Sequence, residues 1–176
     1  MAVGLPGGYQ PKGTVMHLRR ILAPVDQSEP SHHAARSAAE MAIRFQAELH
    51  LLHVVTPQLI YAEWPELVMP PEDLTEEMLE QCRRYLEGLE KELTEMGATV
   101  TVHCEESAMR PFAAISRFAG DLPADLIVIG SHGRSGLRHA LLGSTAERVV
   151  RKAPTPVLVV KSAESAPELP ESAPEG

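Results

Sequence analysis

The sequence contains little of what a disulfide-stabilised protein requires. Its 176 residues include two cysteines, Cys82 and Cys104, which do not form a CxxC motif. Small secreted scaffolds take much of their stability from several disulfides, so this count argues against a disulfide framework. We therefore predict that both thiols act as small hydrophobic side chains and that the protein is cytoplasmic.

Long apolar runs and an excess of positive charge are also missing. A membrane-spanning helix needs roughly 18 consecutive apolar residues, and no segment of the chain provides them. Residues 1–18 lack the apolar run of a secretory signal. The formal net charge is -8, whereas nucleic-acid binding requires a basic surface. We expect neither a membrane nor a nucleic acid as a partner.

The composition divides the chain into three parts. Residues 1–17 contain several glycines and prolines without any periodicity, which predicts a flexible lead-in. Residues 162–176 read SAESAPELPESAPEG, and their four glutamates account for half of the net charge of -8. Such a segment cannot bury enough apolar surface to offset its ordering entropy, so we predict a disordered acidic tail. One domain is left, residues 18–161.

Strand and helix patterns alternate through this domain. Strands are predicted at residues 20–26, 48–55, 98–104, 124–130 and 156–160, and helices at 30–45, 73–96, 111–119 and 145–152. This order predicts an α/β fold: a five-stranded parallel, doubly wound (Rossmann-like) sheet with helices on both faces. The alternating polarity of residues 98–104 places that strand at an edge.

A glycine-rich segment, GSHGRSGLRHALLGST, follows the apolar strand 124–130 and leads into a helix. The first turn of a helix offers free N–H groups and the positive end of the helix dipole, which suit a phosphate. Gly130, Gly133 and Gly143 would let the backbone approach a ligand. Ser144 and Thr145 add hydroxyl donors. The segment therefore indicates a phosphate-binding loop.

A purely structural interpretation competes with the phosphate site. The segment matches neither the P-loop pattern nor the GxGxxG dinucleotide fingerprint. Residues 144–147, STAE, also form a capping box with Ser144 as N-cap and Glu147 at position N3. Capping would explain Ser144 without a ligand, but it does not explain the glycines where the strand ends.

Asp26 ends the first predicted strand, as Gly130 ends the fourth. If these strands are neighbours, a crevice opens between their carboxyl ends, where ligands bind in doubly wound folds. A carboxylate there could accept hydrogen bonds from a ribose or an adenine amino group. The alternative is that Asp26 is a turn residue before a helix whose N-cap is Ser28.

Together these residues resemble the universal stress protein family over positions 18–161. The family's nucleotide signature is glycine, two residues, glycine, nine residues, glycine, then serine or threonine. It is complete here as Gly130, Gly133, Gly143 and Ser144. Similar stretches are residues 21–26 (ILAPVD), 52–55 (LHVV) and 156–160 (PVLVV), although Gln27 stands where many members have glycine.

The resemblance implies membership of the ATP-binding subgroup, with Mg²⁺ or Mn²⁺ accompanying the triphosphate. Asp26 and the backbone of Val54 would hold the nucleoside, and Ile129 and Gly130 would lie along the ribose. The phosphates would be held by Gly133, Gly143, Ser144 and Thr145. The family also implies a homodimer joined through the last strand, residues 157–160. An uncovered apolar edge strand favours the same pairing.

We therefore expect a cytoplasmic, homodimeric, ATP-binding regulatory protein of the stress response with a protein partner of unknown identity. The alternative is a slow Mg²⁺-dependent ATPase or a phosphoryl- or nucleotidyl-transferring enzyme, and a flavin-binding module is a third possibility. Asp26 is the one acid that the pattern places near the nucleotide, and no catalytic base is visible. The segment 56–72, with Tyr61, Trp64 and Leu67, could contact a partner or fold over the core.

Overall fold

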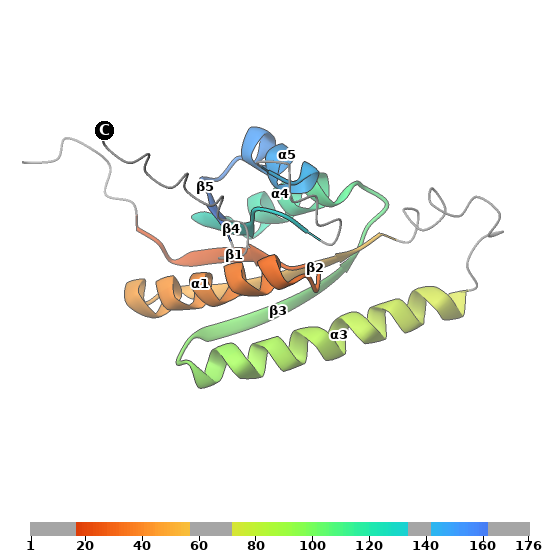
Figure 1. The fold of residues 1–176 in the computed structure, drawn as a ribbon, viewed down its shortest axis with the longest axis horizontal. Coiled ribbons are helices and arrows are strands. Elements are labelled where there is room, and N and C mark those ends of the chain that lie inside the picture. Colours follow the sequence, from red (N-terminus) through yellow and green to blue (C-terminus); the bar gives the residue numbers. More distant parts are fainter. Residues whose placement is uncertain (1–16, 57–71, 134–141, 162–176) are drawn as a thin grey trace, which may run out of the picture.

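A computed structural model describes residues 17–56, 72–133 and 142–161 (Figure 1). The expectations for the two tails and for residues 57–71 concern segments outside these ranges. Within them the chain forms the strands β1 (Arg20–Pro24), β2 (Glu48–Val55), β3 (Thr99–Glu106), β4 (Leu126–Gly130) and β5 (Val157–Val160). The helices are α1 (Glu29–Phe45), α3 (Glu72–Glu95), α4 (Pro111–Asp121) and α5 (Ser144–Lys152).

The strands of the described chain form one parallel sheet in the order β3-β2-β1-β4-β5. The chain builds outward from β1 to β3, then crosses back to place β4 on the other side of β1. The winding direction therefore reverses between β1 and β4, which is the point where doubly wound sheets bind ligands. The predicted fold class and the edge position of β3 are confirmed, and β1 and β4 are neighbours, which is the condition set above for a crevice between them.

Helices cover both faces of the sheet, with α1 and α3 on one side and α4 and α5 on the other (Figure 1). Along β1, Ile21 and Ala23 pack toward α1, whereas Leu22 packs toward α4 and α5. All three side chains are fully buried. This two-sided burial explains why the central strands are continuously apolar rather than alternating.

Alanines let α1 lie close to the sheet. Five alanines of this helix are each at most 1% exposed, and they form the face that packs on β1 and β4: Ala34, Ala35, Ala38, Ala39 and Ala42. Small side chains reduce the distance between helix and sheet. The first turn of α1 is thereby brought against the carboxyl end of β4.

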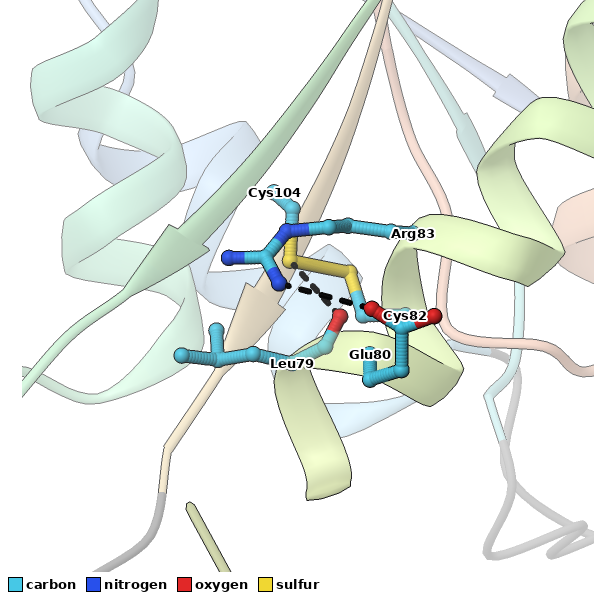
Figure 2. The surroundings of a disulfide bond; sticks show 5 residues. All are labelled: Leu79, Glu80, Cys82, Arg83 and Cys104. Carbon is cyan, nitrogen blue, oxygen red and sulfur yellow. Dashed lines mark hydrogen bonds and ion pairs between the residues drawn. A yellow bond between two sulfur atoms is a disulfide. The ribbon is translucent and has the colours of Figure 1, made fainter. Parts of the chain in front are cut away.

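The prediction for the cysteines is wrong in one respect. Cys82 of α3 and Cys104 of β3 form a disulfide, with Cα atoms 6.4 Å apart and a sequence separation of 22 (Figure 2). Sequence spacing did not reveal the pair because α3 folds back onto the strand that follows it. The expected burial does hold, since Cys82 lies in the core and Cys104 packs against it. The prediction of a cytoplasmic protein rested partly on unpaired thiols, and the disulfide removes that support.

The described helices do not include one that is both long and apolar enough to cross a membrane.

Candidate functional site

A cavity of about 190 Å³ opens at the carboxyl ends of the strands, around the point where the winding direction reverses. The structure brings every sequence-predicted site residue to its wall: Asp26, Val54, Ile129, Gly130, Gly133, Gly143, Ser144 and Thr145. They come from β1, β2, β4 and α5 or from the turns that adjoin them. The first and last residues of this set, Asp26 and Thr145, are 119 positions apart in the sequence and share one concave surface.

Two chemical environments make up the cavity wall. Leu52, Val54, Ile115 and Ile129 contribute apolar surface, and all four belong to the α4 and α5 side of the core. The remainder includes the first turn of α5 and the glycines that precede it. An apolar slot suits a flat ring, and a helix N-terminus suits an anionic group. The cavity therefore offers complementary surfaces for a molecule that carries both.

Asp26 is fixed by the turn that starts α1. Its Oδ1 accepts hydrogen bonds from the Ser28 N–H, at 3.1 Å, and from the Ser28 hydroxyl. Ser28 is the N-cap of α1, and its Oγ accepts from the Ser31 N–H at 3.4 Å. The turn interpretation of Asp26 is thus confirmed for Oδ1. The second oxygen, Oδ2, lies on the side of Gly133 at the cavity wall.

Gln27, which stands where many family members have glycine, adopts a backbone conformation that suits glycine. Its φ of 66° lies in the left-handed region, where glycine is favoured and other residues are uncommon. Glutamine therefore adopts the conformation that glycine would adopt, at some cost, and the Asp26 turn keeps its shape.

Gly130 has a role that sequence reasoning missed. A Cβ on this residue would lie 2.7 Å from the Pro30 carbonyl oxygen and 2.9 Å from its carbon. These are backbone atoms of the first turn of α1, which cannot move aside as a side chain can. The absence of a side chain at Gly130 is required for helix packing, whether or not a ligand is bound.

Backbone hydrogen bonds close the base of the glycine-rich loop. The Gly143 N–H donates to the Ser131 carbonyl at 2.7 Å, and the Ser131 N–H donates to the Val160 carbonyl at 2.8 Å. The two described ends of the loop are therefore held together and fastened to β5. A Cβ on Gly143 would lie 3.3 Å from both the Ser131 oxygen and the His132 Cα, so this junction is tightly packed.

The predicted capping box is wrong by one residue. Gly143 is the N-cap of α5, Ser144 is its first residue, and no side-chain hydrogen bond caps the helix. Because Gly143 is extended where it closes the loop, it takes the N-cap position, and the helix begins one residue earlier than the pattern suggested. Glu147 consequently lies one position beyond N3, and its carboxylate pairs with Arg151 at 3.0 Å. The structural explanation for the Ser144 hydroxyl is removed, and this exposed residue lines the cavity.

Tyr85 of α3 stands behind the cavity wall and was not singled out by the sequence. Its ring meets His53, a cavity residue, edge to face with centroids 6.3 Å apart. Burial raises the pKa of the Tyr85 hydroxyl, and the Asp26 carboxylate shifts it in the same direction. In the sequence, Tyr85 is one residue of a long predicted helix, so only the packing of α3 against β2 reveals its relation to the cavity.

His50 and His53 point to opposite faces of the sheet, as their spacing predicts, but His50 has a partner that the sequence did not reveal. Its Nδ1 lies 3.1 Å from Nε2 of His103 on the neighbouring strand, and the His103 ring meets Phe118 of α4. Burial lowers the pKa of both His50 and His103. Across the described ranges, no three His, Cys, Asp or Glu side chains gather as a metal site would require.

The fold and the cavity define a class of protein: a doubly wound α/β domain with a ligand-sized cavity at its topological switch point. The model of the universal stress protein family matches residues 17–161, and the chain belongs to this family. Universal stress protein MJ0531 of Methanocaldococcus jannaschii is 38% identical over 147 residues, covering 81% of this chain and 82% of its own length.

Solved structures share the fold. The structure of MJ0577, described as a structure-based assignment of biochemical function, has a TM-score of 0.72 and 32% identity, covering 84% of this chain and 98% of its own. A universal stress protein in complex with cAMP has a TM-score of 0.57 and 24% identity, covering 81% and 95%. The protein of Archaeoglobus fulgidus in complex with dAMP has a TM-score of 0.60 and 21% identity, covering 82% and 98%.

Proposed function

We propose that this chain is an ATP-binding regulatory protein of the stress response, acting as a homodimeric module whose surface responds to the nucleotide. The observation that carries the proposal is the convergence of all eight sequence-predicted residues on one cavity. Four elements contribute to it, so the fold brings Asp26 and Val54 to the same cavity as the local signature of residues 130–144.

The chemistry of the lining supports this placement of ATP. The adenine would occupy the apolar surface near Val54, with Asp26 accepting from the nucleoside and Ile129 beside the ribose. The phosphates would lie at the first turn of α5, where Ser144 and Thr145 donate hydroxyl hydrogens and the helix dipole favours negative charge. The relatives whose structures carry cAMP and dAMP make an adenine nucleotide the natural first choice.

The site suits a divalent cation that is bound mainly by the phosphates of the nucleotide. The described lining holds one carboxylate, Asp26, together with the Ser144 and Thr145 hydroxyls. Mg²⁺ keeps several waters and commonly takes one or two protein oxygens along with substrate phosphates. We therefore place Mg²⁺ or Mn²⁺ on the triphosphate, with these hydroxyls as its protein contacts. When bound, the ion would neutralise phosphate charge.

The same lining favours binding over catalysis. Phosphoryl transfer needs a group that positions or deprotonates the attacking water. Asp26 is the one acid among the described lining residues, and its Oδ1 is already engaged by Ser28. The enzyme alternative requires Mg²⁺-dependent turnover that is lost in Asp26→Ala, and product formation at the rate of a protein-free blank would reject it.

The test of the proposal is calorimetric titration of the ligand-free protein with ATP, ADP, AMP, cAMP and FMN, each with and without Mg²⁺. We expect micromolar ATP binding that weakens as phosphates are removed, because each lost phosphate forfeits contacts at α5. Tighter binding of AMP or cAMP would place a mononucleotide here instead. The absence of heat with every adenine nucleotide would exclude the proposed function, and heat with FMN alone would favour a flavin protein.

The proposed dimer joins two copies through β5, which occupies a sheet edge. Leu158 of β5 and Val150 of α5 are exposed apolar residues, at 39% and 47%. We expect Leu158→Asp to yield monomers by light scattering, because it places a charge in an apolar interface. Val159 is less suitable, since it packs against the core. Phe45→Asp, at an exposed site on α1, is the control, and a dimeric Leu158→Asp protein would move the interface elsewhere.

A further inference from the structure

We propose that Cys82 and Cys104 form a reversible thiol–disulfide switch, and that the disulfide state supports the nucleotide cavity. The second part rests on the proposed ATP function, whereas the first does not. The chain has two cysteines in all, so every thiol reaction of the protein reports on this pair. Neither residue belongs to the cavity wall.

The disulfide fastens the first half of α3 to the sheet. This helix packs on β3, an edge strand, and on β2. Its second half is held by Glu92, which pairs with His32 at 3.0 Å and with Arg36, both on α1. Cys82 and Glu92 are ten residues apart, about 15 Å along a helix. Reduction of the disulfide therefore removes the covalent link between the sheet and the first half of α3, which the Glu92 ion pairs do not hold.

Two contacts connect this fastening to the cavity. Cys104 of β3 lies opposite His53 of β2 in the sheet register, and His53 lines the cavity beside Val54. Tyr85 lies about one helical turn from Cys82, and its ring rests edge-on against the same His53. His53 is thus supported from the strand side and from the helix side by the residues nearest the two sulfurs. A shift of α3 would alter both supports at once.

The exchange chemistry starts at the more accessible sulfur. Cys82 is 1% exposed, whereas Cys104 is half-buried. A thiolate of a dithiol reductant attacks Cys104 Sγ, the S–S bond breaks, and Cys82 takes a proton as the leaving thiol. The second reductant thiol then displaces Cys104, which leaves two protein thiols and an oxidised reductant. In the reverse direction, the Cys104 thiolate attacks hydrogen peroxide, the O–O bond breaks, and a sulfenic acid forms with release of one water. The Cys82 thiol then attacks this sulfur, which forms the S–S bond and releases a second water.

Thermodynamic linkage makes the coupling measurable from both sides. If the disulfide form binds ATP more tightly by some factor, ATP must make the disulfide harder to reduce by the same factor. If the disulfide had a purely structural role, its reduction would lower the stability of the protein, but ATP would not change the ease of reduction. The midpoint of reduction in a dithiothreitol buffer, with and without saturating MgATP, is therefore the decisive readout.

The experiment uses the full chain in three forms: oxidised with peroxide, reduced with dithiothreitol, and the double variant Cys82→Ser/Cys104→Ser. We expect no free thiols in the oxidised form and two in the reduced form. Reduction should lower Tm by about 5–10 °C and weaken MgATP binding by at least about fivefold. The double variant should match the reduced form and ignore dithiothreitol. Saturating MgATP should raise the reductant ratio at the midpoint by the same factor.

Several outcomes would overturn the switch. Two free thiols after peroxide treatment, or a disulfide that links two chains on a non-reducing gel, would remove the pair itself. Equal ATP affinity of the oxidised and reduced forms, or an unchanged reduction midpoint, would remove its coupling to the cavity. If no form binds ATP, the proposed function and the coupling both fail. Thiol counts and Tm then still decide whether the pair switches.

Discussion

Gly133→Val is expected to weaken ATP binding by at least about 100-fold, or about 2.7 kcal/mol, while leaving the fold in place. A Cβ on Gly133 would fall on Oδ2 of Asp26. A free carboxylate could rotate away, but Oδ1 of this one is held by the Ser28 N–H and hydroxyl. The valine must therefore displace either the Asp26 carboxylate or the backbone of the loop. Both belong to the proposed site, so either movement damages it.

Calorimetry with MgATP measures the affinity, and urea unfolding measures the stability, which should change little because Gly133 lies outside the helices and strands. Gly88→Val is the matched control. It adds the same atoms in α3, where a Cβ would meet nothing within 4 Å, and it should bind ATP as the parent does. A Gly133→Val protein with parental affinity would show that the phosphates lie elsewhere.

The fold followed from the sequence because its signals repeat over many residues. Five apolar strand patterns alternate with four helical ones, and parallel strands with helical crossovers allow few topologies. The position of Asp26 opposite the glycine-rich loop then followed from topology, since it needed only that β1 and β4 be neighbours. The sequence thus predicted the architecture and part of the cavity wall, whereas lining residues such as His53 and Ile115 were not among the predicted site residues.

What the sequence missed depends on packing between elements. The Cys82–Cys104 pair requires α3 to lie on β3 with a particular rotation, which helical periodicity alone does not specify. The contact of Tyr85 with His53 has the same origin. The start of α5 was misplaced by one residue because the closing bond from the Gly143 N–H to Ser131 competes with the capping box. Each miss involves a contact between segments whose separation in sequence carries no signal.

The glycines of the signature meet different physical demands, which a second substitution separates. Gly130→Ala is expected to lower the free energy of unfolding by about 1–3 kcal/mol through overpacking. Its Cβ would clash with the backbone of Pro30, and neither α1 nor β4 can move away easily. Buried alanines and the Ser28 cap hold α1, while β4 pairs with β1 and β5.

Urea unfolding measures this loss, and Gly120→Ala in α4 is the control. There a Cβ would touch only the Pro154 Cγ at 3.9 Å, an ordinary contact, and alanine should stabilise the helix by up to about 1 kcal/mol. A Gly130→Ala protein as stable as the parent would show that α1 can withdraw from β4 at little cost. If Gly130→Ala loses stability and Gly133→Val loses ATP, the signature combines a packing requirement with a ligand requirement. Within the signature, Gly130 would then be weaker evidence for a nucleotide than Gly133.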